Sequence, residues 1–383
     1  MNNGLDELRL KIDEADKAIT EAVIERMRIS GDIARYKKEN GLPILDSRRE
    51  REKLTRIAES VPEEFRSTVR VLYSLIFELS RSYQSSLNEP RTALFEEISN
   101  AIENTPRLFP ESCTVACQGV EGANSTAACE RMFRSPSIMY MKDFDSVFSA
   151  VESGLCRYGV LPIENSTAGS VNKVYDLMLS ENFNIVRSTR IKIEHNLLVK
   201  PGVKLEDIRE VFSHEQAISQ SSEFLSSLHG VKVTPCANTA VAAEMVAKSE
   251  RRDIAALASY SCAELYGLDC IARGVQDNDN NHTRFICISR ELEIYPGADR
   301  TSLMLTLPHK PGSLYKALAR LYALGINLRK LESRPMPDRD FEFMFYFDLE
   351  TSVYSAEFVR LICELDSIAE EFKYLGSYSE IMA

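Results

Sequence analysis

Cationic and amide side chains in the first 88 residues are spaced so that they would meet on shared helix faces. Arg26 interrupts an apolar stripe, and Lys37, eleven residues later, lies only about 20° around a helix from it. Ser80 and Gln84 are four residues apart and would share a face of another helix. Two cations would therefore point into the core, where they could form a local basic pocket for an anionic ligand. The alternative is that these residues extend into solvent or lie at the surface.

A second set of polar side chains follows apolar, strand-like runs. Ligands bind at the carboxyl ends of strands in open parallel sheets, so these residues could line one site. Two alternatives remain open: a serine followed three residues later by glutamine is also a helix-capping pattern, and a threonine at a strand start is often only a strand former. The clusters lie at 119–125, 162–169, 213–220 and 281–285, and they contain Ser125, Glu164, Asn165, Ser166, Ser213, Gln216, Gln220, Thr283 and Arg284.

The elements that must position the first set are helices. Residues 1–88 contain only two prolines, Pro43 and Pro62, and are rich in helix-forming residues. The pattern predicts helices over about 5–39, 47–59 and 63–87, with a helical or loose connector from Asn88 to about 110. The first helix would be roughly 50 Å long. Two shorter helices cannot cover its apolar stripe, which predicts a partner chain and hence a homodimer or larger assembly.

From residue 112 onward short β-rich runs alternate with helical segments, which predicts an α/β fold with a largely parallel sheet. Residues 289–300, which include a Pro-Gly pair, are expected to be a linker. The remaining pattern is β-α-β-β-α-β, a ferredoxin-like unit. The sequence therefore predicts a multidomain protein with domains over 1–90, 110–290 and 299–383.

Composition excludes several classes of protein. The chain has 383 residues, and 57 acidic against 46 basic residues give a net charge of -11, the wrong sign for a general binder of nucleic acid or anionic membranes. The sequence has no run of 18 apolar residues and no signal-like start, so we expect a cytoplasmic protein. Nine scattered cysteines without matching Cys or His pairs predict neither a disulfide framework nor a zinc site.

The helical segment resembles the all-helical chorismate mutase family. The matching motifs are L-R-x-x-I-D around Arg9, E-R at Arg26, Lys37, P-I-L-D-x-x-R-E-R over 43–51 and S-x-x-x-Q over 80–84. The resemblance implies an intertwined dimer that rearranges chorismate to prephenate, with Arg9 serving the partner's pocket. This unimolecular reaction would need the site only to fix the reactive conformer and to stabilise charge developing on the ether oxygen, without a nucleophile, metal or cofactor. By resemblance, Arg9, Arg26 and Arg49 would bind the substrate carboxylates, Lys37 and Gln84 the ether oxygen, and Asp46, Glu50 and Ser80 the hydroxyl or its surroundings.

The α/β segment resembles prephenate dehydratase through P-I-E-N-S over 162–166, S-H-x-Q-A over 213–217 and N-x-T-R-F over 281–285. The resemblance implies two lobes, like those of periplasmic binding proteins, with the site between them. Thr283 would be the main catalytic residue, supported by Glu164, Asn165, Ser213 and Gln220, whereas Arg284 would either pair with a substrate carboxylate or be structural. Val120, Glu215 and Asp279 stand where relatives often have proline. Because proline sets loop stiffness rather than chemistry, these departures affect loop geometry.

The last segment resembles ACT domains, small units that sense amino acids. Gly312-Ser313-Leu314 and Glu332-Ser333-Arg334 match phenylalanine-binding loops, with Asn327 as a further contact. Together the resemblances imply a bifunctional enzyme of phenylalanine biosynthesis inhibited by phenylalanine. The alternatives are a plain ferredoxin-like dimerisation unit at the C-terminus, an enzyme with only one working site, and a non-catalytic sensor of amino or keto acids. Thr283 and the helical cations disfavour the sensor.

Overall fold

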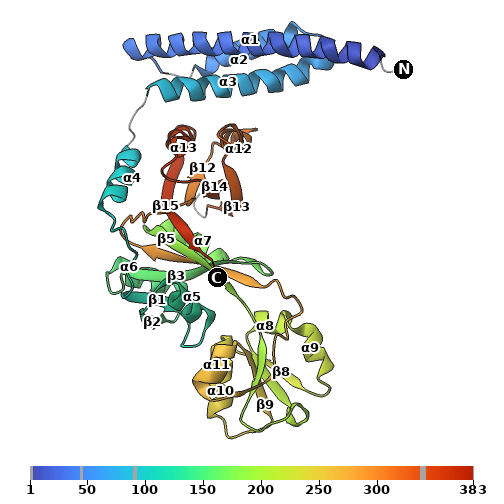
Figure 1. Ribbon diagram of the computed structural model, residues 1–383, viewed down its shortest axis with the longest axis vertical. Coiled ribbons are helices and arrows are strands. Elements are labelled where there is room, and N and C mark those ends of the chain that lie inside the picture. The colour runs from blue at the N-terminus through green and yellow to red at the C-terminus, as the bar shows by residue number, and fades with distance from the viewer. Residues whose placement is uncertain (1–2, 44–45, 89–92, 337–341, 383) are drawn as a thin grey trace. The chain divides into compact units, whose positions relative to one another are not determined.

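The computed structural model describes residues 3–43, 46–88, 93–336 and 342–382 (Figure 1). The chain divides into two compact units. The first consists of Met1–Glu96, Leu307–Ile326 and Ala356–Glu371, and the second of Glu97–Thr306, Asn327–Ser355 and Phe372–Ala383. The division therefore cuts through the predicted C-terminal domain: its helices group with the first unit and its strands with the second.

The first unit contains the helices predicted at the start of the chain: α1 (Asn3–Glu39), α2 (Ser47–Glu59) and α3 (Arg66–Asn88), with a 3-10 turn at Glu63–Phe65. These bounds confirm the sequence prediction to within three residues. Both α1 and α2 pack against α3. Asp46 caps α2 by accepting a hydrogen bond from the backbone N–H of Arg49 at 3.0 Å. The unit also contains α12 (Ser313–Ala323) and α13 (Ala356–Asp366). Part of the predicted connector, residues 89–92, lies outside the described residues, and α4 (Ala93–Asn104) follows it.

One face of α1 leaves large apolar side chains uncovered. Leu8, Ile12 and Ile19 are 57%, 59% and 56% exposed. Scattered exposed apolar residues are normal, but a row of them along one helix face marks a contact surface. The overlong apolar stripe expected from the sequence is therefore present.

The first lobe of the second unit is a sheet with strand order β5-β11-β3-β1-β2. The short strand β4 (Gly169–Ser170) pairs with β3. The strands are β1 (Thr114–Gln118), β2 (Ser137–Met141), β3 (Tyr158–Asn165), β5 (Asn184–Lys192) and β11 (His282–Ser289), and the helices are α5 (Asn124–Met132), α6 (Phe144–Glu152) and α7 (Asn172–Ser180).

The second lobe, formed by residues between β5 and β11, has a five-stranded sheet of order β10-β6-β9-β7-β8. Its strands are β6 (Asn196–Val199), β7 (Glu210–Ser213), β8 (Lys232–Pro235), β9 (Ile254–Ala258) and β10 (Asp269–Ala272). Its helices are α8 (Glu215–Ser219), α9 (Ser222–Ser227), α10 (Thr239–Lys248) and α11 (Tyr260–Tyr266), with a 3-10 turn at Leu205–Asp207. Both lobes belong to the second compact unit, and extended segments run between them in Figure 1.

The sheets are mixed, so the prediction of a largely parallel sheet was wrong. β1 runs parallel to β2 and β3, but β11 is antiparallel to both β3 and β5, and β6 is antiparallel to β9 and β10. The reason for β11 is the two-lobed layout. β5 leaves the first lobe at the edge where β11 returns to it, so these two neighbours must run in opposite directions.

The C-terminal strands continue the first-lobe sheet. They are β12 (Arg300–Thr306), β13 (Asn327–Pro335), β14 (Phe343–Glu350) and β15 (Glu371–Ile381), in the order β13-β14-β12-β15, and Ser379–Ile381 pair with Arg187–Thr189 of β5. Gly376 allows this approach: its φ is 130°, and a Cβ atom there would lie 2.3 Å from the carbonyl oxygen of Ile185. With α12 and α13 the chain order is β-α-β-β-α-β, and residues 290–299 connect β11 to β12, as predicted.

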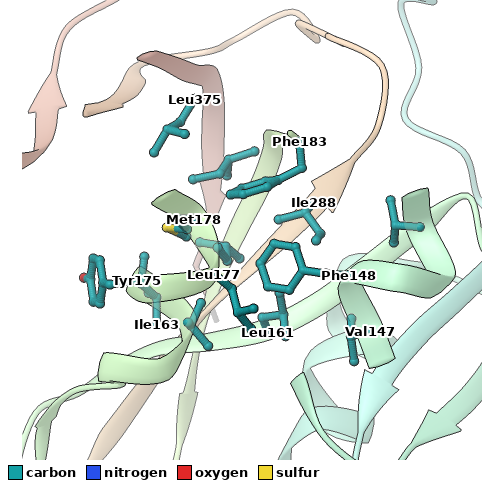
Figure 2. Packing of buried hydrophobic residues seen from close by; sticks show 14 of the residues in the cluster. Val147, Phe148, Leu161, Ile163, Tyr175, Leu177, Met178, Phe183, Ile288 and Leu375 are labelled. Carbon is teal, nitrogen blue, oxygen red and sulfur yellow. The ribbon is translucent and has the colours of Figure 1, made fainter. Parts of the chain in front are cut away.

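A single hydrophobic core joins the first lobe to the C-terminal strands. Phe148, Leu161, Met178 and Ile288 of the lobe pack in one buried cluster with Leu375 of β15 (Figure 2). Met304, Tyr346 and Tyr378 from the same group of strands belong to it as well. Because protein interiors are close-packed, a shift of these strands would displace the side chains of the lobe that pack against them. Among the described helices, none is long and apolar enough to span a bilayer.

Candidate functional sites

A cavity of about 200 Å³ lies among α1, α2 and α3. All but one of the residues predicted for the first site line it: Arg26, Lys37, Asp46, Arg49, Glu50, Ser80 and Gln84. The exception is Arg9, which lies exposed on α1 with Asp6 as its ion-pair partner at 3.3 Å. Three distant segments of sequence thus meet around one space.

Arg26 is part of the cavity wall, so the alternative that it simply extends into solvent does not hold. Its guanidinium donates hydrogen bonds to the Ser80 hydroxyl and to the carbonyl oxygen of Ile76, the latter at 3.4 Å. Its central carbon lies 5.4 Å from the centroid of the Phe77 ring. Burial lowers the pKa of Arg26 from its ordinary value, against the opposing effects of Tyr73 and Glu50. An arginine still remains charged at any physiological pH.

Gln84 is held by a residue that the sequence analysis missed. Its Nε2 donates to the hydroxyl of buried Ser30 at 2.7 Å, and its Oε1 has no hydrogen-bond partner among the described atoms. A hydroxyl can donate as well as accept, so the amide can also be turned over with Ser30 as donor, which would present the Gln84 NH2 group to the cavity. Gln84 can therefore offer the cavity either a donor or an acceptor.

Two further cations, Lys53 and Arg81, also line this cavity and were missed. Arg81 forms ion pairs with Glu50 and Glu78. Burial disfavours the charged guanidinium, but the two carboxylates outweigh it and raise the pKa of Arg81. Helical spacing was an available signal, since Lys53 lies one turn after Arg49.

A second cavity, of about 330 Å³, has walls from both lobes of the second unit. Five predicted residues line it: Ser125, Asn165, Gln216, Gln220 and Thr283. The carboxyl end of β3 and the start of β11 face the segment 214–220 and the residues 237–239 that enter α10. This agrees with the expectation that polar residues at strand ends meet at one site.

Thr283 and Asn165 lie opposite each other in the β11–β3 pairing. The Asn165 Nδ2 donates to Thr283 Oγ1 at 2.9 Å, so the threonine has a defined neighbour at the cavity wall. Gln220 approaches from the second lobe and is bonded through its Oε1 to His195 and Asn281. The threonine is therefore not merely a strand former, because its hydroxyl belongs to a polar network.

Glu164 and Arg284 do not line the cavity. They pair with each other in register, one residue away from Asn165 and Thr283, and successive strand residues face opposite sides of a sheet. The Glu164 carboxylate lies 2.6 Å from the Lys330 ammonium and 3.5 Å from Arg284. Burial alone would raise the pKa of Glu164, but Lys330 and Arg284 hold it below its ordinary value. The alternation along β3 was a signal that only one of Glu164 and Asn165 could face the site.

Arg284 takes the structural one of its two expected roles. Its side chain is 5% exposed and bonds to Asp348, Glu380 and Tyr378. Burial alone would lower the pKa of this guanidinium, but the surrounding acidic groups, with Tyr378 and Asp348 foremost, raise it above the ordinary value. Its charge is committed to these C-terminal partners, so it is not presented to a ligand in the cavity.

Ser213 and Ser166 are also outside the cavity wall. Ser213 is fully buried and donates to the carbonyl oxygen of Leu257 at 2.6 Å. It does not cap α8 either, because the cap is the His214 side chain, which accepts from the backbone N–H of Gln216 at 3.2 Å. Ser166 donates to the carbonyl oxygen of Asn280 at 2.7 Å and so fastens the segment before Thr283. Both serines act on backbone geometry.

The described residues that line the second cavity include no lysine or arginine. Two helix N-termini line the cavity instead: Asn124 and Ser125 are at the start of α5, and Asn238 and Thr239 are at the start of α10. Helix N-termini expose backbone N–H groups and carry partial positive charge, which favours carboxylates. The sequence analysis missed Asn238 and Thr239, although Asn before an alanine-rich run is an N-cap pattern.

The predicted effector motifs fall in both compact units. Gly312, at φ 87°, is the N-cap of α12, which places Gly312, Ser313 and Leu314 in the first unit. Asn327, Glu332, Ser333 and Arg334 lie on β13 in the second unit, where Glu332 accepts a hydrogen bond from Ser170 at 2.6 Å and Arg334 binds Asp176 at 2.8 Å.

Comparison with known proteins matches both sites to families. Residues 8–85 match the model of chorismate mutase type II, and residues 115–293 match that of prephenate dehydratase. The chain is 30% identical to the bifunctional chorismate mutase/prephenate dehydratase of Escherichia coli (strain K12), over 98% of this chain and 96% of that protein.

Two solved structures resemble about 70% of the chain. Prephenate dehydratase from Arthrobacter aurescens in complex with L-Phe is 26% identical, with a TM-score of 0.64, over 70% of this chain and 90% of that one. The quorum-quenching acylase GqqA is 33% identical, with the same TM-score of 0.64, over 70% of this chain and 98% of that one. Both family models and the full-length relative agree, so the chain belongs to the family of bifunctional chorismate mutase/prephenate dehydratases, enzymes of phenylalanine biosynthesis.

Proposed function

We propose that the two activities are divided between the two cavities. The cavity among α1, α2 and α3 rearranges chorismate to prephenate, and the cavity between the lobes converts prephenate to phenylpyruvate. The observation that supports this division is that each cavity gathers the polar residues of one motif set from distant parts of the sequence. The corresponding domains are 1–90 and 110–290.

In the mutase cavity the cationic side chains bind the substrate and stabilise its developing charge. The rearrangement is unimolecular: the ether C–O bond breaks while a C–C bond forms, and no proton moves. Arg26 and Arg49 bind the two carboxylates and hold the reactive conformer, which supplies the orientation part of the acceleration. Lys37 and Gln84 then stabilise negative charge that develops on the ether oxygen. Asp46, Glu50 and Ser80 bind the substrate hydroxyl or position these groups.

In the dehydratase cavity Thr283 assists loss of the ring hydroxyl. The C–CO2 bond breaks, its electron pair enters the ring, and the hydroxyl leaves as water with a proton from Thr283, which solvent replaces. Aromatisation provides the drive, so a weak acid within hydrogen-bond reach suffices. The N-termini of α5 and α10 hold the substrate carboxylates, and Asn165 and Gln220 fix the polar groups around Thr283. Ser125 and Gln216 contact the substrate from either lobe.

The segment 299–383 acts as an ACT-type regulatory domain that binds phenylalanine and inhibits the dehydratase. The chain order β-α-β-β-α-β and the strand order β13-β14-β12-β15 support it, as does the phenylalanine-bound relative. The contacts of β13 supply a route, because Lys330 binds Glu164, the neighbour of Asn165. Glu332 and Arg334 of the same strand contact the first lobe.

The working assembly is a homodimer built on α1. The exposed apolar row at Leu8, Ile12 and Ile19 needs a covering surface, and a second α1 offers a self-complementary one. Arg9, exposed near the start of α1, would then reach the partner's cavity. A cytoplasmic location remains a prediction.

A coupled assay on the full-length protein tests the assignment. Chorismate loss and phenylpyruvate formation are followed separately, with and without phenylalanine, for the wild type, Thr283→Val and Gln84→Leu. Thr283→Val should abolish phenylpyruvate formation and leave chorismate loss unchanged, whereas Gln84→Leu should do the reverse when prephenate is supplied. Phenylalanine should suppress the dehydratase. The sensor alternative predicts ligand binding without turnover, and hydrolysis of an acyl amide instead of prephenate turnover would favour an acylase.

A further inference from the structure

The orientation of the Asn165 amide is fixed by the backbone. Its Oδ1 accepts from the N–H groups of Thr167 at 3.0 Å and Ala168 at 2.8 Å. Backbone N–H groups can only donate, so the oxygen must face them and the NH2 group must face the other way. An amide orientation is usually ambiguous, but here two donors of unambiguous polarity settle it.

This polarity passes along a chain of side chains. The Asn165 NH2 donates to Asn281 Oδ1 at 2.8 Å, so the oxygen of Asn281 is the acceptor and its NH2 group must point away. That NH2 donates to Gln220 Oε1, also at 2.8 Å. Asn281 is 1% exposed and has no freedom to turn without losing both bonds.

The same reasoning assigns the proton on His195. Gln220 Oε1 lies 2.9 Å from His195 Nε2, and an oxygen that only accepts requires Nε2 to carry hydrogen. Burial lowers the pKa of His195, against a smaller opposite effect of Gln220, so the ring is neutral at physiological pH. A neutral ring with hydrogen on Nε2 has none on Nδ1.

Two hydrogen-bond donors on residues that line the cavity have no acceptor among the described protein atoms. Thr283 Oγ1 accepts from Asn165 at 2.9 Å, which turns its own hydrogen away from Asn165. The Gln220 Nε2 is buried, belongs to a residue that lines the cavity, and has no partner among the described protein atoms. If the hydrogen bonds between these side chains ran in the opposite direction, Gln220 would offer an acceptor, and Thr283 would donate its hydrogen to Asn165.

We propose that His195 and Asn281 are positioning residues of the dehydratase: together they hold the Gln220 NH2 group toward a substrate oxygen and keep Thr283 as a hydrogen donor. This inference rests on the proposed dehydratase function of the cavity. It assigns roles to two residues that act through Gln220 and Asn165, without requiring contact with the substrate.

The tautomer of His195 tests the inference without reference to activity. The full-length protein, labelled with 15N-histidine, is recorded in two-bond 1H–15N correlation spectra at pH 7.5, and the His195 signal is identified by its loss in His195→Gln. The chain has five histidines, so the spectrum is simple. We expect the pattern of a neutral ring with hydrogen on Nε2. Hydrogen on Nδ1 alone would overturn the inference, even if the protein converts prephenate as proposed.

Kinetics test the consequence. His195→Leu should lower dehydratase kcat/KM about 10- to 100-fold, and His195→Gln, which keeps an N–H donor, should recover part of the loss. Chorismate mutase activity of the same preparation should not change, because the mutase cavity lies in the first unit. His229→Leu is the matched control, because His229 is exposed and outside the cavity. An unchanged kcat/KM in His195→Leu would refute the positioning role, whereas a wild type without dehydratase activity would refute the proposed function instead.

Discussion

Replacing Lys330 with methionine removes the ion pair between β13 and the strand that carries Asn165. The Lys330 Nζ lies 2.6 Å from Glu164 Oε2 and 2.9 Å from the Ser170 hydroxyl. The two side chains are 15% and 29% exposed, so this pair is far better shielded than a surface pair. Methionine keeps most of the aliphatic length, so the change is chiefly one of charge.

The size of the effect follows from the degree of burial. Exposed pairs contribute about 0.2–1 kcal/mol, and breaking a fully buried pair costs about 3–5 kcal/mol. Glu164 keeps Arg284 at 3.5 Å, so its charge is not left without compensation. We therefore expect a loss of about 1–2 kcal/mol in the free energy of unfolding. For a cooperative unit of about 250 residues, the size of the second unit, this lowers Tm by roughly 2–8 °C.

The assay combines unfolding with regulation. Calorimetry gives the Tm, and dehydratase activity is measured against phenylalanine concentration. Lys192→Met is the matched control, because Lys192 and Glu194 are also 2.6 Å apart but are about half exposed. We expect Lys330→Met to weaken phenylalanine inhibition and Lys192→Met to leave it unchanged. If both variants had the same Tm and wild-type inhibition, the contact between β13 and Glu164 would carry neither stability nor regulation.

The same pair predicts a pH dependence. The pKa of Glu164 is below its ordinary value in the folded protein, although burial alone would raise it, because Lys330 and Arg284 favour the carboxylate. A depressed carboxyl pKa contributes stability above the unfolded pKa, about 4.5, and the contribution is lost as pH falls below it. Lys330→Met should therefore lose less stability than the wild type between pH 5 and pH 3, as measured by urea unfolding.

Two further predictions concern the remaining surfaces. Ile19→Asp places a charge in the exposed apolar row of α1, so it should shift the protein toward the monomer in sedimentation experiments. Mutase activity should fall at least tenfold, whereas dehydratase activity should persist. Sedimentation like that of the wild type would contradict the proposed dimer. Hydrogen bonds from Thr234, Arg251 and Lys232 lower the pKa of Glu210 to about 2. Glu210→Gln should therefore reduce the loss of unfolding free energy as pH falls from 4.5 toward 3. An unchanged dependence of the unfolding free energy on pH would contradict this.

The sequence by itself determined what depends on local patterns. The 3.6-residue periodicity and the prolines at 43 and 62 located α1, α2 and α3 closely. Helical spacing likewise placed Arg26 and Lys37 on one face, and the structure puts both on one cavity wall. These successes share a cause, since the 3.6-residue repeat of a helix sets which residues share a face whatever the rest of the chain does.

Only the tertiary structure decided which side of each strand faces the second cavity. Glu164 and Asn165 are equally polar neighbours, and strand alternation requires them to face opposite sides without saying which is which. The choice depends on β13 and β14, which lie more than 160 residues after Glu164 and Asn165. Lys330 of β13 forms an ion pair with Glu164, and Asp348 of β14 forms one with Arg284. The same holds for the hydrogen bond of His195, which forms only because the second lobe brings Gln220 within 2.9 Å of it. Such contacts are set by long-range pairing and burial, which leave no periodic trace in the sequence.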